Sequence, residues 1–150
     1  MDPIALLKAD HRKVEELFKK LEDTTERAVK TRTELFEKLN QELTVHALAE
    51  EAILYPENKE IKETRDLGFE AVEEHHVVKM LLSELSEMSP DTEEWTAKLK
   101  VLEENVKHHV KEEEQELFPK TKKALTSEEL DEMGNRLFQE KEKLLGHMPS

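Results

Sequence analysis

The sequence contains no cysteine, which excludes disulfides, thiolate metal ligands and thiol nucleophiles. Only 3 glycines and 5 prolines occur among 150 residues, too few for the many turns of an all-β fold. No apolar run approaches the roughly 20 residues that cross a bilayer. Residues 1–7 also lack the basic-then-apolar pattern of a secretory signal. We therefore expect a cytoplasmic protein that makes no contact with a membrane.

Basic residues are scarce relative to acidic ones. The chain carries 36 Asp and Glu against 23 Lys and Arg, so its formal net charge is −13. Binding to a DNA or RNA backbone requires a basic face, so the charge argues against a nucleic-acid partner. High charge can accompany disorder, but the apolar residues here are strongly periodic and predict a folded chain. The length predicts one domain over residues 1–150.

Capping residues and prolines divide the chain into five predicted helices. The first has Asp2 as N-cap and runs to about residue 21, and the second follows a turn at 23–26 in which Glu26 is placed for a capping box. A third covers roughly 65–87, and a fourth starts at the Ser-Pro-Asp signal of 89–91. Pro56 and Pro119 are expected to end the second and fourth helices, because proline lacks the N–H that continues a helix. A capping box at 126–129 opens the fifth, which ends near residue 146.

In the first four predicted helices apolar residues recur every three or four positions, which gives each helix one apolar face. Four such helices with short connections predict an all-α fold, an antiparallel up-down-up-down four-helix bundle. The fifth helix has a weaker stripe and is expected to pack on the outside as an additional C-terminal helix.

Polar residues interrupt the apolar stripes at six positions, and all four helices contribute. The six are His11, His46, Glu50, His75, His109 and Glu113. An unpaired carboxylate in a dry core costs several kcal/mol, so these groups must satisfy one another or bind a cation. Imidazole nitrogens and carboxylate oxygens suit iron, manganese or zinc. The six residues are therefore predicted metal ligands. The alternative is a buried ion-pair network that only specifies the bundle.

Spacing supports the metal hypothesis. His46 and Glu50 are four residues apart, as are His109 and Glu113, so each pair lies on one helix face. The apolar register also selects His75 over His76 and His109 over His108. His76 and His108 are therefore expected on the solvated surface, and so are the acidic neighbours of the selected glutamates, namely Glu51, Glu112 and Glu114.

The two halves of the chain are alike. A shift of 63 residues places the His46/Glu50 segment over the His109/Glu113 segment, and a shift of 64 places His11 over His75. Each half is thus a predicted helical hairpin that supplies one single histidine and one HxxxE pair. Two matched half-sites favour two metal ions over one.

Four segments carry a resemblance to the hemerythrin-like HHE cation-binding family: DHRKVEELF at 10–18, HALAEEAILYP at 46–56, EEHHVVKMLL at 73–82 and HHVKEEEQELFP at 108–119. The resemblance covers roughly residues 4–145. It implies a four-helix bundle with two iron ions joined by an oxo or hydroxo group. It also implies that the four histidines are terminal ligands and that Glu50 and Glu113 bridge the irons.

The sequence departs from the oxygen-carrying members of that family at one position. Those proteins have a further histidine four residues after the third-helix ligand, where this chain has Lys79. On an octahedral count about two coordination positions then stay open. Tyr55, one turn beyond Glu50, could fill one of them. The alternative is a tyrosine packed at a helix end with its hydroxyl in water.

Open positions favour reaction over reversible O₂ storage. The sequence therefore favours a di-iron oxidoreductase-type protein that acts on O₂, H₂O₂ or NO, while leaving open whether it is an enzyme. The alternatives are a module that senses, carries or stores iron or O₂ without turnover, and a metal-free structural bundle. Manganese and zinc suit the same ligands as iron.

Overall fold

The structure is a computed structural model that describes residues 1–147. Over this range it consists of α-helices α1 (Pro3–Glu22), α2 (Val29–Ala49), α3 (Tyr55–Glu60), α4 (Arg65–Ser86), α5 (Glu93–Glu112), α6 (Phe118–Ala124) and α7 (Ser127–Gly146). Two π-helical segments, η1 (Glu50–Leu54) and η2 (Glu113–Leu117), join α2 to α3 and α5 to α6. Among the described residues no helix is long and apolar enough to cross a membrane.

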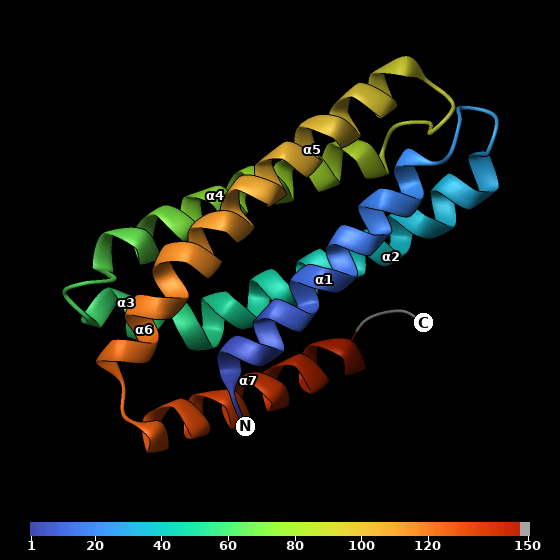
Figure 1. The fold of residues 1–150 in the computed structure, drawn as a ribbon. Coiled ribbons are helices and arrows are strands. Elements are labelled where there is room, and N and C mark those ends of the chain that lie inside the picture. Colours follow the sequence, from blue (N-terminus) through green and yellow to red (C-terminus); the bar gives the residue numbers. More distant parts are fainter. Residues whose placement is uncertain (148–150) are drawn as a thin grey trace.

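Two antiparallel hairpins form the bundle. α1 packs against α2, and α4 packs against α5, with both connecting loops at the same end of the molecule (Figure 1). The predicted up-down-up-down order is therefore confirmed. α7 runs along the outside, packed on α1, α2 and η1, and lies on the opposite side of the bundle from α4 and α5 in Figure 1. The outer position predicted for the fifth helix is confirmed as well.

The predicted helix ends at the two prolines are wrong. The chain stays helical through Pro56 and Pro119, because a π turn precedes each of them. In η1 the Tyr55 N–H donates to the Glu50 carbonyl, five residues back, and in η2 the Phe118 N–H donates to the Glu113 carbonyl. Each proline then stands in the first turn of the next α-helix, where a missing N–H leaves no bond unmade.

Two predicted starts also differ from the structure. The second helix begins later than predicted, with Ala28 as N-cap, and has no capping box from Glu26. The start expected at 89–91 lies at Glu93, where the Thr92 hydroxyl accepts from the Trp95 N–H. The Asp2 cap and the Thr126–Glu129 capping box form as predicted.

The core consists of two apolar clusters with a polar layer between them. One cluster lies toward the hairpin loops and includes Phe18, Phe36, Trp95 and Leu102. The other lies toward η1, η2 and α7 and includes Leu7, Tyr55 and Leu137. On each bundle helix a histidine stands between members of the two clusters, as in Leu7, His11 and Val14 on α1. The fold thus gathers the four helices' histidines at one level.

A buried arginine, Arg32, makes hydrogen bonds that connect the two hairpins at the loop end of the bundle. Arg32 donates to the Thr24 hydroxyl, to the Pro90 carbonyl at 2.8 Å and to the Thr96 hydroxyl at 2.9 Å. Its guanidinium also lies over the Trp95 ring, 5.1 Å from the ring centre. Because these contacts join both hairpin loops, Arg32 fixes one hairpin against the other at the end remote from η1 and η2.

Candidate metal centre

All six predicted ligands are buried and converge in the polar layer. We call them the core cluster: His11, His46, Glu50, His75, His109 and Glu113. Their ligand atoms form two groups that share Glu50. One group is His11, His46, Glu50 and Glu113, and the other is Glu50, His75 and His109. This is the two-part arrangement that the internal repeat predicts.

The two glutamates connect the two groups. Glu50 Oε1 lies 3.1 Å from His46 Nε2 and 3.2 Å from His75 Nε2. Glu113 reaches across with both oxygens, Oε1 lying 3.1 Å from His11 Nε2 and Oε2 3.5 Å from His109 Nε2. Each carboxylate thus stands between a histidine of one hairpin and a histidine of the other, which is the position of a bridging ligand.

Each core histidine is also held from outside by a second carboxylate, at its Nδ1 atom. We call Asp10, Glu51, Glu74 and Glu114 the outer carboxylates. Their pairs are His46 with Asp10 at 2.9 Å, His75 with Glu51 at 3.0 Å, His109 with Glu74 at 2.7 Å and His11 with Glu114 at 2.6 Å. A carboxylate can only accept, so Nδ1 carries the proton and Nε2 presents its lone pair to the cluster. This is how metal-binding histidines are oriented in proteins.

The expectation that Glu51 and Glu114 belong to the solvated face is therefore wrong. Their side chains are 28% and 21% exposed and hold His75 and His11. Asp10 and Glu74 carried no prediction. The internal repeat does relate these four residues in the sequence. Asp10 aligns with Glu74 at the shift of 64, and Glu51 aligns with Glu114 at the shift of 63. His76 and His108 are exposed, as the register predicts.

Tyr55 lies inside the cluster, so the alternative of a hydroxyl in water is wrong. The residue is fully buried, and its hydroxyl donates to Glu113 Oε2 at 2.6 Å. The oxygen is also 3.1 Å from the Nε2 atoms of His75 and His109. At the matching place in the other half, Phe118 stacks on His11 with 5.9 Å between ring centres. The hydroxyl therefore distinguishes one half-site from the other.

The cluster fits bound cations. His75 Nε2 and His109 Nε2 lie 3.1 Å apart, while the Nδ1 atom of each is already bonded to an outer carboxylate. Glu50 Oε2 is buried and has no hydrogen-bond partner among the described residues. Converging imidazole nitrogens and an unpartnered buried carboxylate oxygen are costly unless positive charge lies among them, supplied either by metal ions or by protons on the imidazoles. Metal ions would supply that charge.

Without metal, protons on the core histidines supply the positive charge that balances the buried carboxylates. Burial lowers the pKa of His46, but Glu50 and Asp10 outweigh burial and raise it to about 10. The pKa of His109 is likewise raised, since Glu113 and Glu74 outweigh burial. Burial opposes ionisation of Glu113, yet His109 and the hydrogen bonds it accepts hold its pKa well below the usual range. Metal binding must therefore displace protons from these imidazoles.

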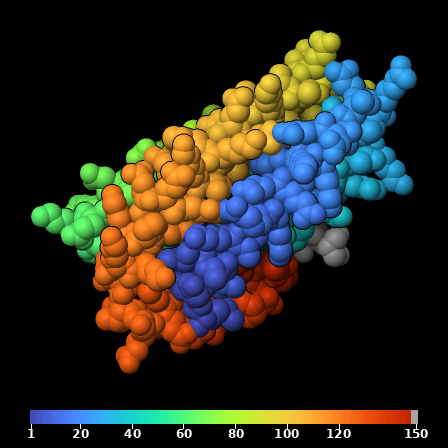
Figure 2. Space-filling view, viewed as in Figure 1, coloured from blue at the N-terminus to red at the C-terminus, as the bar shows by residue number. Residues whose placement is uncertain are grey.

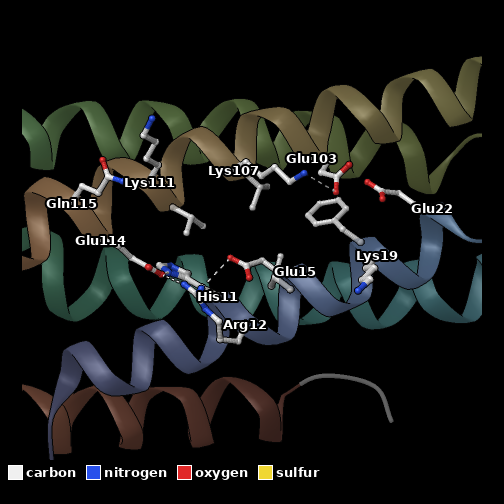
Figure 3. Close-up of a pocket in the computed structure, with 14 residues that line it drawn as sticks. His11, Arg12, Glu15, Lys19, Glu22, Glu103, Lys107, Lys111, Glu114 and Gln115 are labelled. Carbon is white, nitrogen blue, oxygen red and sulfur yellow. Dashed lines mark hydrogen bonds and ion pairs between the residues drawn. The ribbon is translucent and has the colours of Figure 1, made fainter.

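Two spaces adjoin the cluster. A cavity of about 30 Å³ lies against all four histidines and is also lined by apolar side chains, among them Val14, Leu43 and Val78. A groove of about 520 Å³ runs between α1 and α5, with Val14, Phe18, Val106 and Val110 along it. Figure 3 shows His11, Arg12 and Glu114 at one end of this groove and Glu22 and Glu103 toward the other. Figure 2 shows the same face, with α1 in blue beside α5 in yellow to orange.

Comparisons with known proteins agree with this geometry. A family model described as the hemerythrin HHE cation binding domain matches residues 2–121. A DNA nickase of Nostoc sp. (strain PCC 7120) is 30% identical over 139 residues, which are 93% of this chain and 39% of that protein. The chain thus spans about two fifths of that relative's length. The crystal structure of a hemerythrin HHE cation binding domain-containing protein from Mycobacterium kansasii has a similar fold, with a TM-score of 0.83, 24% identity and coverage of 97% of this chain and 88% of that one.

Proposed function

The chain belongs to the hemerythrin HHE cation-binding domain family, and from that premise we propose that it is a non-haem di-iron protein that reacts with O₂, H₂O₂ or NO. One observation carries the proposal. Four histidines, each held at Nδ1 by an outer carboxylate, direct their Nε2 atoms at two shared glutamates. That ligand set is suited to a pair of first-row transition metal ions.

His11 and His46 would hold one ion and His75 and His109 the other, with Glu50 and Glu113 between them. Iron at these positions would supply redox chemistry toward a small oxygen- or nitrogen-containing ligand. Manganese or zinc would suit the same donors, and only iron and manganese are redox-active. The proposal therefore depends on the identity of the metal, which must be measured.

The residues around the site favour a very small ligand. The cavity against the histidines, about 30 Å³, has room for a water molecule or a diatomic and not for an organic substrate. Apart from the four histidines, its walls are valine, leucine and alanine side chains, which suit an apolar gas. Tyr55 supplies a proton donor, since its hydroxyl is buried among the ligands. Burial, Glu113 and Glu50 all raise the pKa of Tyr55, so the hydroxyl keeps its proton there unless a metal ion binds it.

The name of the Nostoc relative concerns a protein of which this chain covers 39%. We do not propose nicking of DNA for this chain, because its net charge of −13 disfavours contact with a phosphate backbone.

The first test is the metal content and visible spectrum of protein purified in air. We expect about two irons per chain and a near-ultraviolet absorption band, both lost in Glu50→Ala and retained in His76→Ala. Rates of H₂O₂ and NO consumption by the iron-loaded protein then separate the two functional classes. A stable O₂ adduct without turnover would favour a carrier, store or sensor. Zinc, a single metal ion or no metal would overturn the di-iron proposal.

A further inference from the structure

A second group of ligating side chains lies on the outer surface of the α4–α5 hairpin. Glu74 of α4 and His108 and Glu112 of α5 bring three ligand atoms within 4.8 Å of one another. Neither the HHE motif nor the core cluster uses His108 or Glu112. We propose that these three residues form a third site for a divalent transition-metal ion, separate from the core cluster and open to solvent.

The spacing of the three atoms is already close to that of a metal site. His108 Nε2 lies 3.6 Å from Glu74 Oε2 and 3.5 Å from Glu112 Oε2. Donors about 2.1 Å from a tetrahedral ion are about 3.4 Å apart, so only small side-chain rotations are needed. His108 and Glu112 are four residues apart on α5 and share one face. Glu74 comes from the neighbouring helix, so a bound ion would join α4 to α5.

The internal repeat supplies an independent argument. Asp10 is the counterpart of Glu74, and each has one oxygen on the Nδ1 atom of a core histidine. The other oxygen of Asp10 accepts from Lys141 of α7 at 2.5 Å, so its negative charge meets a cation from the protein. α7 packs on α1 and α2. On the α4–α5 side, the second oxygen of Glu74 faces His108 instead, and a bound metal ion would take the place of the lysine ammonium.

Charge and exposure also suit a cation from solution. Two carboxylates and one imidazole leave the group negative, within a chain of net charge −13. The side chain of His108 is 67% exposed, so a hydrated ion can reach it, whereas Glu74 and Glu112 are 22% and 23% exposed and are held more firmly. Because Glu74 also binds His109, the ion would sit one carboxylate away from the core cluster.

The test is a Zn²⁺ titration of the protein as purified, followed by calorimetry, with the core metal content measured separately by elemental analysis. We expect one Zn²⁺ per chain beyond the core content. His108→Ala and Glu112→Gln should each weaken this binding at least tenfold and leave the core metal content unchanged. His76→Ala is the matched control, since His76 is an exposed histidine of α4 outside the group, and it should bind Zn²⁺ as the wild type does.

Three results would overturn the third site: no additional Zn²⁺ in the wild type, unchanged binding in His108→Ala, or an equal loss in His76→Ala. These results do not depend on which metal occupies the core cluster. The Zn²⁺ bound at the surface is obtained by comparing the wild type with variants whose core cluster holds the same amount of metal. Failure of the di-iron proposal would instead appear in the elemental analysis of the wild type.

Discussion

At the scale of single residues, the core histidines are constrained from two sides. An inner carboxylate lies at Nε2 and an outer carboxylate accepts the proton of Nδ1, as with Glu50 and Asp10 around His46. Such outer partners fix the ring orientation, and their loss typically costs 10–100-fold in metal affinity. The four outer carboxylates are therefore part of the site's function even though none of them faces the cluster.

Tyr55 gives the sharpest test at this scale. Tyr55→Phe should leave a folded bundle, since Phe118 occupies the matching place in the other half. It removes the donor to Glu113 Oε2, so we expect metal-stripped protein to lose about 1–3 kcal/mol of unfolding free energy. In loaded protein we expect a changed visible spectrum, because the hydroxyl lies within 3.1 Å of two ligand nitrogens.

Chemical denaturation and absorption spectroscopy measure both effects, with Phe118→Leu as a comparison that alters packing and no hydroxyl. A Tyr55→Phe protein with the wild-type spectrum and stability would show that the hydroxyl neither binds metal nor supports Glu113.

At the scale of elements, the π turns explain what the sequence predicted and what it did not. The stripe locates all six core residues, because up to Glu50 and Glu113 the helices are regular and burial follows the 3.6-residue period. Tyr55 is five residues after Glu50, which in an α-helix is about 140° away around the axis. The π turn places it on the same face as Glu50 instead. A register argument that assumes an α-helix therefore cannot place Tyr55 at the cluster, which is why the sequence left its role open between a ligand and a tyrosine at a helix end.

The outer carboxylates were missed for a different reason. Asp10, Glu51, Glu74 and Glu114 each precede or follow a core residue directly in the sequence, at positions that the stripe assigns to the flank of a helix. In a chain with 36 acidic residues, a carboxylate on a flank carries little information by itself. The repeat pairs these four residues in the sequence, but only the packing of neighbouring helices shows which histidine each one reaches.

α7 contributes to the site through one residue, and this can be tested. Lys141 donates to Asp10, which in turn holds His46. Lys141→Ala leaves the buried carboxylate of Asp10 without its cation, so we expect a loss of about 1.5–3 kcal/mol of unfolding free energy and weaker metal retention. Lys143→Ala, an exposed lysine of the same helix, is the control and should change neither. Equal behaviour of the two variants in denaturation and in metal release to a chelator would contradict this role for α7.

At the scale of the whole molecule, the polar layer lies between two apolar clusters and couples them. Helices α1, α2 and α4 contribute to both clusters and to the layer between them, while α5 contributes to one cluster and the layer and η2, which follows it, contributes to the other cluster. The state of the core cluster therefore acts on the stability of the entire bundle. Metal-stripped protein satisfies the layer with protons and loaded protein satisfies it with metal ions, so the two forms should respond differently to pH.

We expect the thermal stabilities of the two forms to diverge as pH rises. In stripped protein the pKa of His46 is about 10, against about 6.5 when unfolded, so its stabilising proton is fully present below pH 6.5 and is lost toward pH 10. For each such proton, the unfolding free energy falls by roughly 1.4 kcal/mol per pH unit between the unfolded and folded pKa values. A loss of 1 kcal/mol lowers the Tm of a domain this size by about 2–4 °C. In loaded protein the imidazoles are neutral ligands, which removes this dependence.

Circular-dichroism melts with and without chelator from pH 6 to 9.5 measure the difference. The gap in Tm should widen by several degrees across that range. Stripped Glu50→Ala serves as the control, since it lacks the carboxylate that contributes most to the raised pKa of His46, and its Tm should fall less with pH. A gap that stays constant or narrows would mean that protons on the core histidines do not hold the polar layer together when the metal ions are gone.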